Sequence, residues 1–153
     1  MFKINRRIEY ALITLKYMSH TQPGQLTSAK TMCDIYNMPF DPTARVLQIM
    51  AQNGILKADQ GAHGGYQIIK DLSKVSFSEL ADMIVGPIQI ANCFHGNYDH
   101  CDLTANCNVI GPMLNLNENM SKLFKTISVK DLIQSRHQTE KVIKEKYEKA
   151  HAA

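Results

Sequence analysis

The stretch SAKTMCDIYNMPFDPTARVLQIMAQNGIL, residues 28–56, decides the fold of this chain. Its first part predicts a short helix that ends at Tyr36, because Thr27 or Ser28 can cap it and apolar residues follow at helical spacing. The inward-facing residues of this helix are Ala29, Met32 and Ile35. A turn at residues 37–40 then leads to a second helix, so the stretch predicts a helix-turn-helix pair.

The second helix is the candidate for recognition of a partner. Asp41 can cap it with Pro42 at its first position, and Gly54 ends it. Its buried side is formed by Val46, Leu47, Ile49 and Met50. Two extended runs follow at residues 55–58 and 66–70, and the glycines of the DQGAHGG segment between them permit a tight hairpin. This hairpin is a wing, so the whole unit is predicted to be a winged helix-turn-helix.

Further helices are predicted on both sides of this unit. Before it, residues 5–20 carry an apolar stripe made of Ile8, Ala11, Leu12, Leu15 and Met18. After it, SFSELADMIVG at residues 76–86 predicts a helix in which Ser76 and Glu79 resemble a capping box. The inward side of that helix is formed by Phe77, Leu80, Ala81 and Ile84, and Gly86 with Pro87 ends it. The fold class is therefore α+β and mostly α.

The C-terminal half holds a cysteine-rich loop and a long apolar helix. Residues 91–108 lack apolar periodicity, which predicts an irregular loop. An apolar series then runs from Val109 to Ile127 and is broad enough to need a partner surface, most simply a second copy of itself. A short helix is predicted at residues 128–133. We therefore expect a homodimer with a DNA-binding domain at residues 1–86, a cysteine loop at 87–108, dimerisation and short C-terminal helices at 109–135, and a charged tail at 136–153.

Composition limits the class of protein. The 153 residues, 44% of them hydrophobic, suffice for one core and a modest second element. No apolar run reaches the length of a membrane span, and MFKINRRIEY does not resemble a secretory signal, so we expect a cytoplasmic protein without a membrane partner. In that reducing compartment the four cysteines favour metal or redox chemistry over disulfides. The excess of basic residues lies in the N-terminal half, which mildly favours a polyanionic partner.

Five motifs occur in an order that resembles the Rrf2 family of bacterial regulators. They are RRIEYAL, SAKTMCDIYNMP, TARVLQIMAQNGIL, GAHGGY and the cysteine loop, and the resemblance extends to VKDLI at residues 129–133. It leaves only the tail uncovered. The resemblance implies a winged-helix dimer that binds palindromic operators in double-stranded DNA, with no small-molecule substrate.

The resemblance also implies a DNA-binding surface. The predicted recognition helix presents Thr43, Arg45 and Gln48 outward, where Arg45 can pair with guanine and Gln48 with adenine. Lys3, Arg6 and Arg7 can reach phosphates, and His63 lies at the tip of the wing. Gln60 stands where relatives carry an arginine close to the wing, which weakens the expected contribution of the wing to specificity. Each of these side chains is also compatible with a plain solvated surface.

Three cysteines form the candidate metal site. Cys93, Cys101 and Cys107 are separated by seven and then five residues, and their soft thiolates suit an iron-sulfur cluster. The family pattern favours a cluster, with a 4Fe–4S cluster preferred over 2Fe–2S. Zinc is the chemical rival, because His95 or His100 from the same loop would complete a Cys₃His site. Three reduced cysteines without any ligand are the remaining alternative.

A fourth cluster ligand is implied by the resemblance at Glu9, reaching the cluster from the partner subunit. Some relatives instead use a histidine three residues after the last cysteine, but Ile110 occupies that position here. Glu9 has an ordinary alternative role, because an acidic residue in a first helical turn complements the helix dipole. Cys33 lies inside a predicted helix and is expected to be a small buried side chain.

The predicted function is transcriptional regulation, with repression favoured, under control of iron, nitric oxide or redox state. The alternative within the same fold is a metal-independent or zinc-binding regulator that senses redox state through its thiols. An enzyme is not expected, because the sequence offers no paired carboxylates, no nucleophile with a base and no phosphate-binding glycine loop.

Overall fold

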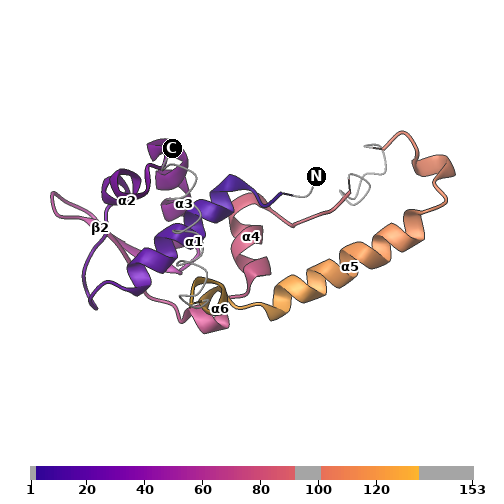
Figure 1. Cartoon of the computed structure of the whole chain (residues 1–153). Coiled ribbons are helices and arrows are strands. Elements are labelled where there is room, and N and C mark those ends of the chain that lie inside the picture. Colours follow the sequence, from indigo (N-terminus) through magenta and orange to yellow (C-terminus); the bar gives the residue numbers. More distant parts are fainter. Residues whose placement is uncertain (1–2, 92–100, 135–153) are drawn as a thin grey trace, which may run out of the picture.

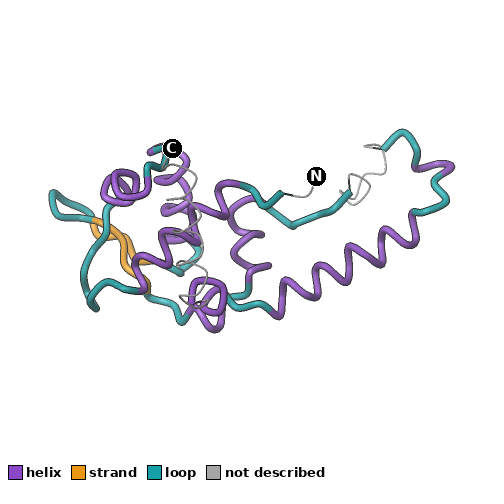
Figure 2. Tube along the Cα trace, in the orientation of Figure 1, coloured by secondary structure: helices purple, strands orange, loops and turns teal. Residues whose placement is uncertain are grey.

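The computed structural model describes residues 3–91 and 101–134 and is mostly helical (Figure 1). In the first range, helices α1, α2 and α3 span Arg6–Ser19, Ala29–Tyr36 and Phe40–Gln52, strands β1 and β2 span Leu56–Asp59 and Gly65–Ile68, and η1 and α4 span Leu72–Lys74 and Phe77–Val85. In the second range, η4, α5 and α6 span Thr104–Asn106, Ile110–Thr126 and Val129–Gln134. Figure 2 shows the small sheet beside the helices. The predicted α+β, mostly α fold with a winged helix-turn-helix is confirmed.

The main core forms where α1, α3, α4 and α6 meet. Leu15, Leu47 and Leu80 are fully buried there, and Val129 of α6 joins the same cluster. Each such aliphatic side chain contributes about 1.5–3 kcal/mol by leaving water. Because α6 packs into this cluster, the chain returns to the N-terminal helices after α5.

The turn between α2 and α3 differs in detail from the prediction. Ser28 caps α2, as one of the two expected candidates, and its Oγ accepts a hydrogen bond from the Thr31 N–H at 3.1 Å. Asp41 does not cap α3, because that helix begins two residues earlier than predicted, at Phe40 instead of Pro42, with Pro39 as its N-cap residue. Pro42 is tolerated in this first turn, where helical N–H groups lack partners within the helix. Ile35, expected to face inward, is 51% exposed.

The position of Thr43 also differs from the prediction. The outward position predicted for it is wrong, because its side chain is fully buried on the core side of α3. Its hydroxyl donates a hydrogen bond to the Pro39 carbonyl oxygen at 2.8 Å. This bond satisfies the hydroxyl without solvent, so a polar residue is stable at a buried position of α3.

The wing is an antiparallel hairpin held to the body by a third strand-like segment. Leu56 pairs with Ile68 and Asp59 with Gly65 across β1 and β2. Thr27 pairs with Tyr66 through two backbone hydrogen bonds of 2.9 Å, which the sequence prediction did not include. A Cβ atom at Gly65 would lie 2.8 Å from the backbone of Thr27, so only glycine permits this approach.

Helices α4 and α5 follow the prediction closely. Ser76 and Glu79 form the expected capping box of α4. Helix α5 begins at Ile110, so Pro112 lies in its first turn, where a proline is tolerated. Phe124 of α5 packs edge to face on Phe77 of α4, with the ring centroids 5.2 Å apart. Among the described residues, no helix combines the length and the hydropathy that a membrane crossing requires.

Candidate nucleic-acid interface and metal centre

The outward face of α3 carries the two predicted base-reading side chains that remain after the correction at Thr43. Arg45 and Gln48 are exposed, whereas Val46 and Leu47 between them are buried against the core. The rear packing therefore fixes the helix while its polar side faces solvent, which is the arrangement of a recognition helix.

A shallow groove lies between α3 and the wing. Gln48 and Gln52 line it from the helix, and Gln60 and Tyr66 line it from the hairpin, around a volume of about 330 Å³. His63 is exposed in the loop that joins β1 and β2. Lys57 and Asp59 of β1 form an ion pair at 3.3 Å beside this groove. Glutamine side chains line this groove from both sides, and such side chains can form hydrogen bonds with DNA.

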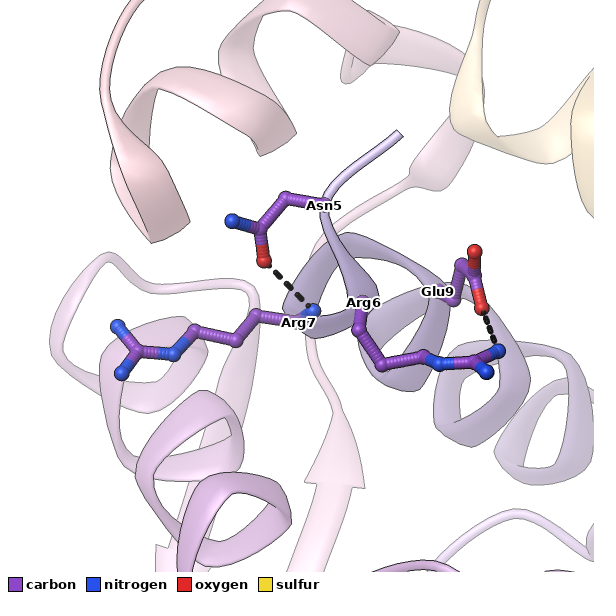
Figure 3. A network of polar contacts seen from close by, with 4 residues as sticks. All are labelled: Asn5, Arg6, Arg7 and Glu9. Atoms are coloured by element: carbon purple, nitrogen blue, oxygen red, sulfur yellow. Dashed lines mark hydrogen bonds and ion pairs between the residues drawn. The ribbon is translucent and has the colours of Figure 1, made fainter. Parts of the chain in front are cut away.

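The predicted phosphate-contacting residues gather at the start of α1 (Figure 3). The Asn5 side chain caps this helix by accepting a hydrogen bond from the Arg7 N–H at 2.9 Å. Arg6 pairs with Glu9 one turn along, while the Arg7 side chain points to the other side. The hydrogen bond and the charge of Glu9 raise the pKa of Arg6. Lys3 is exposed just before the helix.

Two of the three predicted cysteine ligands lie on either side of η4. Cys101 and Cys107 are free thiols, each half-buried, and Cys101 accepts hydrogen bonds at its carbonyl oxygen from the N–H and hydroxyl of Thr104. These bonds fix the turn that separates the two thiols. Cys93, His95 and His100 lie outside the described residues. Cys33 is half-buried in α2.

The donor set at η4 fits a soft metal centre but is incomplete within the described part of one chain. Two sulfur donors are compatible with iron-sulfur or zinc chemistry. No group of three or more His, Cys, Asp and Glu side chains that could hold a metal ion is found in residues 3–91 and 101–134. Figure 1 shows residues 101–109 at the end of α5 that is remote from α1, so Glu9 of the same chain does not join them.

Helix α5 leaves a large apolar surface uncovered. None of its residues is buried, and Leu114, Leu116 and Leu123 are each about half exposed. A groove of about 730 Å³ opens between α5 and the N-terminal residues, lined by apolar side chains such as Ile4, Ile88 and Met120. Exposed apolar surface of this extent is typical of a protein interface.

The helix pair, the exposed polar face of α3 and the hairpin beside it define a winged helix-turn-helix DNA-binding protein. The chain belongs to the Rrf2 family, whose description is "Iron-dependent Transcriptional regulator" and whose model matches residues 4–135. The resemblance found in the sequence is thereby confirmed. The family consists of transcriptional regulators rather than enzymes.

Relatives and solved structures agree with this assignment. The chain is 22% identical to the HTH-type transcriptional regulator NsrR of Shouchella clausii, over 82% of this chain and 84% of that protein. Its fold is similar to that of CymR, described as the global cysteine regulator of B. subtilis, with a TM-score of 0.66 and 16% identity over 89% of this chain and 99% of that one. It is also similar to T. potens IscR, with a TM-score of 0.61 and 11% identity over 87% of each chain.

Proposed function

We propose that this chain is a homodimeric regulator, acting as a repressor, whose binding to a palindromic operator depends on an iron-sulfur cluster. The ligands would be Cys93, Cys101 and Cys107 of one subunit with the partner subunit's Glu9. One observation carries the proposal: two free, half-buried thiols flank a single turn at the end of α5, the element whose apolar face needs a partner. The iron-dependent character of the family supports it. A cytoplasmic location follows from the DNA target.

The dimer is an essential part of this proposal. A second copy would cover the exposed leucines of α5 and the groove of about 730 Å³ beside it. It would also supply an acidic residue from the start of α1, which the same chain does not bring to η4. Carboxylate ligation would require Glu9 to leave its pairing with Arg6, an exposed contact that contributes little to stability.

The cluster would fix the distance between the two recognition helices of the dimer. A cluster in this site would supply iron that reacts with nitric oxide or oxidants and is lost when iron is scarce. Residues 101–107 and α1 are then held together only in the loaded dimer, so operator affinity differs between the loaded and metal-free forms. Coupling of this kind typically changes affinity by about 5–150-fold.

The metal content of the protein tests the proposal. Protein purified without oxygen is expected to contain iron and acid-labile sulfide and to absorb visible light. Cys101→Ala and Cys107→Ala should lose both components, whereas Cys33→Ala should keep them, because Cys33 lies in α2. Wild-type protein that contains neither iron nor sulfide would overturn the proposal.

A thiol-based regulator of the same fold is the second candidate. It is favoured by the free state of Cys101 and Cys107 and by the fold likeness to a cysteine regulator. A colourless oxygen-free preparation that still binds its operator, and loses binding on oxidation, would support this candidate. Stoichiometric zinc without sulfide would support its zinc-binding form.

A further inference from the structure

The first residue of α3 is a large apolar side chain that the fold leaves in solvent. Phe40 is 54% exposed, although a phenylalanine in the first turn of a helix can readily be buried. Thr43, about one turn further along α3, is buried in the core instead. Phe40 belongs to the helix because α3 begins two residues before Pro42, the first position that Asp41 as a cap would give.

Phe40 lies in the same row of the helix as Gln48. Residues four apart are neighbours along the surface of an α-helix, so Phe40, Ala44, Gln48 and Gln52 form one row. The far end of this row, at Gln48 and Gln52, lines the groove between α3 and the wing. Eight residues of helix rise about 12 Å and turn by about 80° around the helix axis, so Phe40 lies at the edge of the face that carries Gln48. From this edge the ring of Phe40 is close to a DNA duplex that contacts Gln48.

We propose that Phe40 is a specificity-determining residue that contacts a thymine methyl group in the major groove. The inference rests on the proposed function, in which α3 is the recognition helix. Thymine is the base that presents an apolar group in this groove, and phenylalanine is among the residues that contact it. The 12 Å separation corresponds to about 3.5 base pairs, so this thymine lies within about four base pairs of the base that Gln48 reads.

The charges around Phe40 favour base edges over the phosphate backbone at this end of α3. Asp41 is exposed beside it, and a carboxylate repels phosphates but can accept a hydrogen bond from the amino group of cytosine. Arg45 lies one turn further on and is exposed on the outward face. Ile35 and Tyr36 are also exposed at the end of α2, so a protein surface is the competing occupant of this patch.

Substitution of single methyl groups in DNA tests the inference. A duplex is first enriched from a randomised pool by the full-length protein purified without oxygen. Each thymine of that duplex is then replaced by deoxyuridine, which lacks only the methyl group. One replacement is expected to weaken binding of the wild type by about fourfold, the factor that corresponds to exposing one buried methyl group. In Phe40→Ala the same replacement should have no effect.

Matched variants separate the outcomes. Phe40→Leu should retain part of the methyl effect, while Ile69→Ala, which removes a 58% exposed side chain outside α3, should retain all of it. Wild-type binding that no deoxyuridine weakens, or a methyl effect that persists in Phe40→Ala, overturns the inference while the proposed function stands. If the pool yields no enriched duplex, the proposed function fails and the inference fails with it.

Discussion

Arg45 is the residue on which sequence-specific binding is expected to depend most strongly. Arg45 is exposed on α3, whereas Val46 and Leu47 are buried, and its guanidinium can pair with both acceptors of a guanine. We predict that Arg45→Ala weakens binding to the cognate operator by about 1–3 kcal/mol and spares binding to random DNA. Titration of both duplexes by fluorescence anisotropy checks this. Lys122→Ala, which removes a charge from α5, should leave the ratio of operator affinity to random-DNA affinity unchanged. If Arg45→Ala lost as much affinity for random DNA as for the operator, the role assigned to Arg45 would be wrong.

Glu79 makes stability depend on pH at the start of α4. The Ser76 N–H donates a hydrogen bond to its carboxylate at 2.7 Å, and this bond is the main reason why the pKa of Glu79 lies below 4.5 in the folded protein. A carboxyl group whose pKa is lower in the folded than in the unfolded protein stabilises the fold at pH values above its unfolded-state pKa. This stabilisation is lost as the pH falls through its folded-state pKa.

The corresponding variant is Glu79→Gln, which keeps the shape of the side chain and removes its charge. Its free energy of unfolding should be about 0.3–1 kcal/mol below wild type at pH 7. The difference should shrink as pH falls below 4.5, as measured by urea denaturation at several pH values. Asp71, whose pKa is lowered mainly by the hydroxyl of Ser73, remains in the variant and maintains part of the acid dependence. A difference that stays constant down to pH 3 would contradict this account.

Single residues of α3 illustrate what the sequence can and cannot predict. Helical spacing identified the buried Val46, Leu47 and Met50, because an apolar side chain gains free energy only on the core side. Thr43 shares the helical spacing of these residues, and its polarity alone led to the wrong outward placement, since its small hydroxyl is satisfied by the Pro39 carbonyl. The sequence places Phe40 in the turn, because Asp41 and Pro42 together resemble the start of a helix. The missed signal is that Asp41 and Pro42 are both also favourable inside a first turn.

At the level of elements, the wing is held by the close approach of β2 to Thr27. Gly65→Ala would place a Cβ atom 2.8 Å from the backbone of Thr27, and backbone atoms cannot move aside as a side chain can. We predict a loss of about 1–3 kcal/mol in the free energy of unfolding, measured by urea denaturation. Ala62→Ser, which adds one atom at the exposed tip of the wing, should be neutral. Equal stabilities of the two variants would show that the bridge does not fix the wing.

The elements themselves were largely predictable, and the contacts between them were not. The capping box and Gly86 marked both ends of α4 because local hydrogen bonds and a positive φ define these ends. The bridge from Thr27 to Tyr66 joins residues far apart in the chain, and no local pattern reports it. The same applies to α6, whose Val129 and Ile133 complete the core beside α1.

For the whole molecule, the exposed face of α5 predicts self-association. A charge introduced at Leu116 or Leu123, each about half exposed, would have to be buried in the proposed dimer. We expect Leu116→Glu and Leu123→Glu to sediment as monomers at concentrations at which the wild type is a dimer. Ile69→Glu should remain dimeric, because Ile69 lies after β2 and away from α5. Dimeric Leu116→Glu and Leu123→Glu variants would place the interface elsewhere.

The assembled site could be predicted only in part. The spacing of the three cysteines indicated soft-metal chemistry, and the structure brings Cys101 and Cys107 to one turn. The place of Glu9 in the site depends on a second copy, and neither the periodicity of one chain nor its fold fixes how two copies meet. Cys93 and the charged tail at residues 136–153 lie outside the described residues, so the expectations for them stay predictions.

The most direct test of the proposed regulator is its operator affinity before and after removal of the metal. Oxygen-free wild-type protein is titrated onto the enriched duplex, then exposed to nitric oxide or an iron chelator and titrated again beside Cys107→Ala. We predict that the affinity of the wild type changes by about 5–150-fold and that the affinity of Cys107→Ala, already metal-free, does not change. Identical affinities of the loaded and metal-free wild type would contradict the account.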